Sequence, residues 1–110
     1  MILYSVRMTA SANRQIIEYT DYITEQSKST KVAEQWSQKI YQKIATLNIH
    51  PKRYAFAQEN DHRDYEIRRQ LIGNYVVLYT IDDAAMVVKV IGFRHAKQLS
   101  ITSVLPTGAD

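Results

Sequence analysis

The sequence contains no cysteine, and its three histidines are not spaced as metal ligands are. A chain without cysteine forms no disulfide and offers no thiolate to a metal ion. At 110 residues it has the length of one domain, which should bury about two-thirds of its unfolded surface and fold without such links. We therefore expect a cytoplasmic protein that uses no cofactor and no metal.

Long hydrophobic runs are also missing. Residues 1–9 alternate between apolar and polar side chains and include Arg7, whereas a secretory signal needs a continuous apolar segment. No later run is long enough to cross a bilayer. We expect neither secretion nor a membrane partner.

Charge of one sign is in small excess, because 14 Lys and Arg residues stand against 11 Asp and Glu residues. A net charge of +3 does not by itself indicate nucleic-acid binding. The exception is local: Lys89, Arg94 and Lys97 occur with no acidic residue before Asp110. The sequence has no glycine-rich phosphate loop and no nucleophile elbow.

The first half of the sequence predicts a strand and two helices. Residues 2–8 alternate with the period of a half-buried strand. Apolar side chains then recur at helical spacing to about residue 25, with Thr9 or Ser11 as the N-cap. After a polar break at 26–30, Ser29 or Thr30 caps a second helix, which Pro51 should end. The expected apolar stripes, read as core, are Ala12, Ile16, Tyr19 and Ile23, then Ala33, Trp36, Ile40, Ile44 and Leu47.

The second half predicts three strands. A loop over 52–63, with two aromatic side chains packed inward, leads to strands at 65–71, 75–81 and 87–93. Gly73-Asn74 and residues 82–85 make the turns, and the last two strands are apolar on both faces, as in the centre of a sheet. The order β-α-α-β-β-β predicts an α+β fold in which a helix hairpin packs on an antiparallel sheet. We expect one domain over residues 1–98 and a flexible tail over 99–110.

Five polar residues flank the two central strands and are the candidates for a functional site. Strand alternation places Arg68 with Glu66 and Gln70 on the solvent side, and Arg69 with Ile67 and Leu71 on the side of the helices. Charged side chains are also common at strand ends for solubility alone. A regular final strand would send neighbouring side chains to opposite faces. The candidates are Arg68, Arg69, Arg94, His95 and Lys97.

The order of four motifs resembles a known superfamily. These are the A…I..Y.DYI pattern from Ala12, the A..W…I…I..L…P pattern from Ala33, and the strings NYVVLYTID and VVKVIGFRHAKQ that start at Asn74 and Val87. Together they resemble the RelE/ParE superfamily of toxins from bacterial type II toxin-antitoxin modules, over about residues 2–98. The resemblance implies a cognate antitoxin whose C-terminal segment wraps the toxin.

The resemblance implies one of two activities. RelE-like members are ribosome-dependent endoribonucleases that cut mRNA with basic residues of the sheet and, in many members, a C-terminal tyrosine or histidine. ParE-like members inhibit DNA gyrase and lack a recognised nuclease site. The long helices, the low net charge and the absence of tyrosine from the FRHAKQLSI segment favour the ParE-like branch.

The two activities assign different roles to the candidate residues. In a gyrase inhibitor, Arg68, Arg69, Arg94 and Lys97 are the expected target-binding residues. In a ribonuclease, Arg68 and His95 are the expected catalytic residues, because arginine binds two phosphate oxygens and histidine exchanges protons near neutral pH.

Overall fold

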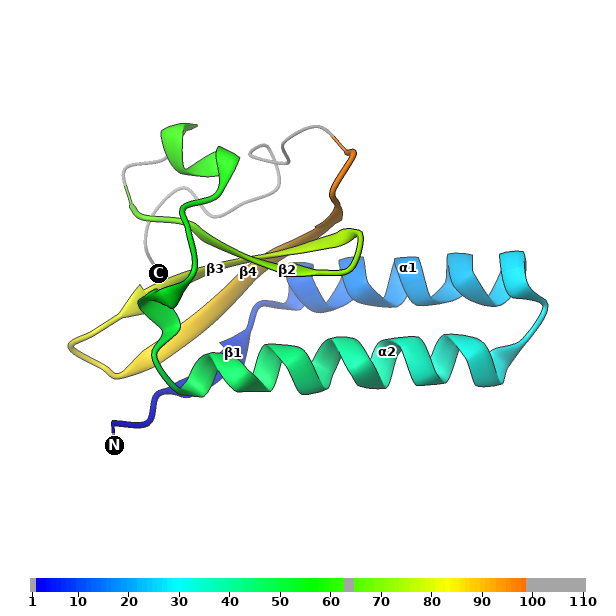
Figure 1. Ribbon diagram of the computed structural model, residues 1–110, viewed down its shortest axis with the longest axis horizontal. Coiled ribbons are helices and arrows are strands. Elements are labelled where there is room, and N and C mark those ends of the chain that lie inside the picture. The colour runs from blue at the N-terminus through cyan, green and yellow to red at the C-terminus, as the bar shows by residue number, and fades with distance from the viewer. Residues whose placement is uncertain (1, 63–64, 99–110) are drawn as a thin grey trace.

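A computed structural model describes residues 2–62 and 65–98 as two layers, with two helices packed on one face of a four-stranded sheet (Figure 1). The predicted α+β fold and element order are confirmed. The tail predicted for residues 99–110 lies outside the described residues. The main elements are β1 (Ser5–Met8), α1 (Ala10–Ser27), α2 (Thr30–Ala45), β2 (Arg68–Ile72), β3 (Tyr75–Asp82) and β4 (Val87–His95).

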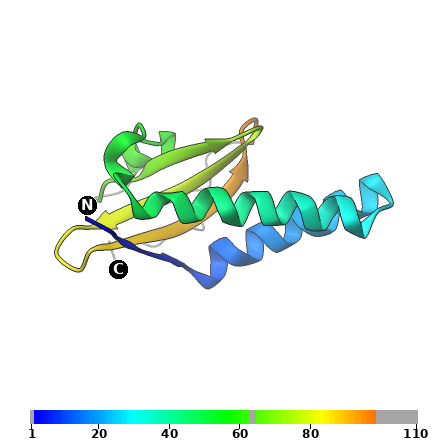
Figure 2. The same ribbon diagram turned by 60° about the horizontal axis from the view of Figure 1, so that its bottom comes forward.

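Both helices begin at predicted caps. The Thr9 hydroxyl accepts a hydrogen bond from the backbone N–H of Ala12 at 3.1 Å, and the Ser29 hydroxyl accepts one from Val32 at 3.2 Å. Such bonds satisfy N–H groups that have no partner inside a helix. Lys28, in the left-handed conformation, separates the two helices. Figures 1 and 2 show that the resulting hairpin extends well beyond the sheet.

The second helix ends earlier than predicted. It stops at Ala45 and is followed by short 3-10 helices at Thr46–Asn48 and Pro51–Arg53, so the prediction that Pro51 ends the helix is wrong. Side chains from outside the helix bind carbonyl groups in its last turn and at its C-cap. Gln70 Nε2 donates to the carbonyl of Lys43 at 2.8 Å, and the guanidinium of Arg53 donates to that of Thr46 at 3.3 Å.

The strand order is β1-β4-β3-β2, so β3 and β4 are central, as predicted. β2, β3 and β4 pair in the predicted antiparallel manner, whereas β1 pairs with β4 in parallel and makes the sheet mixed. β1 begins at Ser5, and Ile2 is 68% exposed instead of lying on the buried face of a strand. Gly73, with a φ of 58°, makes the turn into β3.

Apolar side chains pack on both faces of the sheet. The larger cluster lies between the sheet and the helices and includes most of the two predicted stripes. A smaller cluster lies on the other face. The 3-10 helix Gln58–His62 is on this side of the sheet, away from α1 and α2 (Figure 1). Of the two loop aromatics, Tyr54 packs against the larger cluster, but Phe56 is 46% exposed. The second cluster is formed by Ala57, Ile67, Val76, Leu78 and Ile91, with Tyr65 against it.

Candidate functional site

The candidate residues of β2 and β4 lie toward opposite ends of the sheet. Arg68 is opposite Tyr79 of β3, whereas His95 is opposite Tyr75. These two tyrosines are four residues apart on one strand, which corresponds to roughly 13 Å. Two strand spacings across the sheet add to this separation. In this conformation Arg68 and His95 therefore do not meet at one phosphate group.

Arg68 faces the helix side of the sheet, so the prediction of a solvent-facing side chain is wrong. Its side chain is only 16% exposed, and it shares its face with Gln70 and Ile72, which pack beneath α2 and its C-terminal end. The guanidinium donates to the carbonyls of Lys52 at 3.2 Å and Tyr54 at 2.7 Å. Arg68 thus joins the 52–56 segment to β2.

Arg69 lies on the opposite face of β2, together with Leu71, which is 55% exposed. The prediction that this face meets the helices is also wrong. Alternation misassigned the faces because Ile67 and Ile72, five positions apart, are both buried on different sides of the sheet. The Arg69 side chain is half-buried, and its backbone N–H donates to Ala55.

Arg94 is buried beside the smaller apolar cluster. It donates two hydrogen bonds to the carboxylate of Glu59, from Nε at 2.6 Å and from Nη2 at 3.1 Å. Glu59 is fully buried, and Arg94 is 4% exposed. Paired side chains of this kind hold two segments together, here β4 and the 3-10 helix at 58–62. Contact between Arg94 and a target stays a prediction, and it would require this pair to open.

A β-bulge determines which way the end of β4 faces. Leu78 of β3 is opposite Gly92, but the next residue, Tyr79, is opposite Val90, so Ile91 is an extra residue in β4. An inserted residue reverses the alternation of the side chains that follow it. His95 consequently lies on the helix side, where its ring contacts Tyr75 at 5.3 Å between centroids. Arg94 points the other way, so the two neighbours face opposite sides, as predicted.

Two side chains of α1 accept hydrogen bonds from backbone N–H groups of β4 beyond its pairing with β1. β1 pairs with β4 only as far as Val90, and beyond that point α1 takes its place. Gln15 Oε1 accepts a hydrogen bond from the backbone N–H of Phe93 at 2.8 Å. The hydroxyl of Tyr19 accepts one from His95 at 3.1 Å and donates to Gln98 Oε1 at 2.6 Å. The helical spacing in the sequence predicts Tyr19 only as a core residue, and no sequence pattern marks Gln15.

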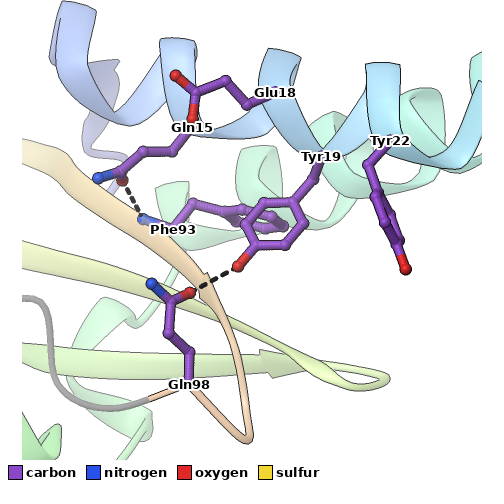
Figure 3. A pocket seen from close by; sticks show the side chains of 6 residues that line it. All are labelled: Gln15, Glu18, Tyr19, Tyr22, Phe93 and Gln98. Atoms are coloured by element: carbon purple, nitrogen blue, oxygen red, sulfur yellow. Dashed lines mark hydrogen bonds between the residues drawn. The ribbon is translucent and has the colours of Figure 1, made fainter.

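A pocket of about 330 Å³ opens where α1 crosses the end of β4 (Figure 3). The Tyr19 ring lies against Phe93, with 5.6 Å between centroids, and Tyr22 projects beside it from the next turn of α1. Lys97 follows the strand and is exposed, and its backbone N–H donates to His95 Nδ1 at 3.0 Å. The lining residues are Gln15, Glu18, Tyr19, Tyr22, Phe93 and Gln98.

Polar groups at the other end of the sheet are joined to one another. The Asp83 carboxylate binds Lys52 Nζ at 2.8 Å and accepts a hydrogen bond from the Tyr4 hydroxyl at 2.8 Å. These contacts, that of Lys52 first, lower the pKa of Asp83, and the Asp83 contact raises the pKa of Lys52. Within residues 2–62 and 65–98 there is no group of three or more acidic or histidine side chains that would hold a metal ion. None of the described helices is long and apolar enough to cross a membrane.

Comparisons with known proteins identify the family of this chain and two solved structures with a similar fold. The family model for the ParE toxin of the type II toxin-antitoxin system parDE matches residues 6–100. A solved structure of the chromosomal ParDE toxin-antitoxin system of P. aeruginosa is similar in fold, with a TM-score of 0.69 and 12% identity over 88% of this chain and 100% of that one. The RelBE2 toxin-antitoxin complex of Mycobacterium tuberculosis has a TM-score of 0.57 and 21% identity, covering 88% of this chain and 97% of its own. No curated protein matches. Because the family model covers most of the sequence, the chain belongs to the ParE toxin family of type II toxin-antitoxin systems.

Proposed function

We propose that this chain arrests bacterial growth by inhibiting DNA gyrase in the cytoplasm and that a cognate antitoxin neutralises it. Membership of the ParE toxin family supports the toxin class. The two similar solved structures are described as toxin-antitoxin systems, and this supports an antitoxin as partner. Gyrase as the target follows from the ParE-like resemblance and from the arrangement of the candidate residues.

The separation of Arg68 from His95 carries the proposal. Cleavage of RNA needs proton transfer and stabilisation of charge at the same phosphate. Arg68 instead binds two backbone carbonyls of its own chain, and His95 lies at the far end of the sheet. Arg94, the basic residue next to His95, is held by Glu59. This arrangement favours inhibition by binding over catalysis.

Two assays with the purified protein test the target. In a supercoiling assay, the protein is expected to inhibit DNA gyrase in a concentration-dependent manner. In an assay with ribosomes that carry a defined mRNA, it should leave the mRNA intact. Cleavage of the mRNA together with unaffected gyrase would overturn the proposal in favour of a RelE-like ribonuclease.

Among the predicted target-binding residues, Lys97 and Arg69 are the two whose side chains form no ion pair or hydrogen bond within residues 2–62 and 65–98. Lys97 is exposed after β4, and Arg69 lies half-buried on the sheet face away from the helices. We expect Lys97→Ala and Arg69→Ala each to weaken gyrase inhibition severalfold. Lys31→Ala, an exposed cation on α2, is the matched control and should leave inhibition unchanged. Equal inhibition by all three variants would remove these residues from the contact surface.

A further inference from the structure

The pocket between α1 and the end of β4 has an unusual chemistry for this chain. Two tyrosine rings and one phenylalanine ring line it, and among the described residues that line it Glu18 is the only charged one. The protein as a whole carries a net charge of +3. The charge of this aromatic pocket is therefore negative, whereas the net charge of the protein is positive.

The carboxylate of Glu18 is exposed and forms no ion pair with any described residue. Arg14 stands one helical turn before it, but the two are not joined by a salt bridge. From residue 15 to residue 27, α1 contains three acidic residues and no lysine or arginine. The part of α1 that leads away from the pocket therefore continues its negative character.

Aromatic faces beside a carboxylate form a site for a positively charged side chain. The negative face of a tyrosine or phenylalanine ring attracts an ammonium or guanidinium group, and a carboxylate adds an ion pair. A volume of about 330 Å³ is enough to accept one long side chain. Hydrogen bonds to Gln98 and His95 hold the Tyr19 ring in place, while Tyr22 is 56% exposed and projects beside it from α1 (Figure 3).

We propose that this pocket receives an arginine or lysine side chain of the antitoxin, placed between the tyrosine rings and the Glu18 carboxylate. This inference rests on the proposed function, in which an antitoxin neutralises the chain. The position of the pocket suits that role, because Gln98 lines it directly after Lys97 and close to His95. A partner segment seated there would cover the end of β4, next to the proposed target contact Lys97.

Charge reversal at Glu18 tests the proposal with the antitoxin encoded by the adjacent reading frame as the probe. Glu18→Lys is expected to weaken antitoxin binding at least tenfold in isothermal titration calorimetry, and Glu18→Gln about fivefold. Tyr22→Ala should weaken binding severalfold by removing one ring. Glu34→Lys makes the same change at an exposed position of α2 and should bind within twofold of the wild type. Melting curves identify any variant that is unfolded, and Glu18→Gln, the mildest change, gives the result if Glu18→Lys does not fold.

A compensating change identifies the occupant. Each arginine and lysine of the antitoxin is changed in turn to glutamate, and one of these changes should restore binding to Glu18→Lys. Equal binding by wild type, Glu18→Gln and Glu18→Lys would overturn the inference while leaving the proposed function intact. An antitoxin that does not bind even the wild-type chain would instead overturn the neutralisation on which the inference rests.

Discussion

Arg68 and Arg94 were expected at a binding surface, but both guanidinium groups are held within the fold. Arg68 binds the carbonyls of Lys52 and Tyr54, and Arg94 binds Glu59. An arginine that makes such hydrogen bonds within its own chain helps to position the segments that it joins. At the scale of single residues, each of these two side chains therefore has a structural contact in the folded chain, and its contact with a target stays a prediction.

Replacing Arg94 by methionine is expected to destabilise the protein strongly. The change leaves the Glu59 carboxylate buried without this arginine, which costs on the order of 3 to 5 kcal/mol. Chemical denaturation measures the loss, and Lys97→Met, an exposed neighbour, should change the free energy of unfolding by no more than about 0.5 kcal/mol. An unchanged denaturation midpoint for Arg94→Met would mean that the ion pair is open in solution.

Tyr79 should make stability depend on alkaline pH. Burial raises its pKa from 10.0 to about 12, and its hydroxyl donates to the carbonyl of Pro51. Because the folded pKa is above the unfolded one, the contribution is complete below about pH 10 and is lost as the pH rises toward about 12. We expect Tyr79→Phe to lose less stability than the wild type over this interval, as measured by urea denaturation at each pH. Parallel curves for the two proteins would contradict the assignment.

Alternation of apolar and polar residues does not indicate which face of β2 meets the helices. In a strand with one solvated face, apolar positions mark the core, but β2 lies in a sheet that is covered on both sides. Ile67 and Ile72 are buried on different faces, and Leu71 is exposed, so the pattern was compatible with either assignment. The polar residue Gln70 is buried because it binds the end of α2, which no local pattern reveals.

At the scale of elements, the helices were the most predictable part of the chain. Their apolar spacing and their caps at Thr9 and Ser29 are local properties, and both caps are confirmed. The parallel pairing of β1 with β4 and the bulge at Ile91 depend on contacts between distant segments. For the same reason, the pocket at Tyr19 and Glu18 was not predicted, since its polar residues on α1 are indistinguishable in sequence from a solvated helix face.

Trp36 couples α2 to the aromatic side chains of the sheet. Its ring contacts Tyr75 at 5.1 Å and Phe93 at 6.0 Å between centroids, although the side chain is only partly buried. Trp36→Ala should therefore lower the free energy of unfolding by about 2 to 4 kcal/mol. Val32→Ala, on the same helix and 47% exposed, serves as the control in thermal denaturation. Equal melting temperatures for both variants would place Trp36 outside the core.

At the scale of the whole molecule, His95 separates the two possible activities. A ribonuclease that uses His95 for proton transfer would lose roughly 10² to 10⁴ in cleavage rate on His95→Gln. A gyrase inhibitor needs no proton transfer, so we expect His95→Gln to arrest growth and inhibit supercoiling as the wild type does. Growth curves and the supercoiling assay measure this, with a melting curve to show that the variant is folded. A folded variant that no longer arrests growth would contradict the binding mechanism.

The pairing of β1 with β4 also sets the order in which the chain acquires its structure during synthesis. Ser5 is opposite Val87, so β1 leaves the ribosome well before β4, the strand with which it pairs. The local helix hairpin, by contrast, requires only residues 10–45. Nascent chains that end before Val87 should show helical circular dichroism at most, without cooperative unfolding. The four-stranded sheet therefore becomes complete only after β4 has been translated, and a ribosome that stalls before Val87 leaves a fragment in which β1 has no partner strand.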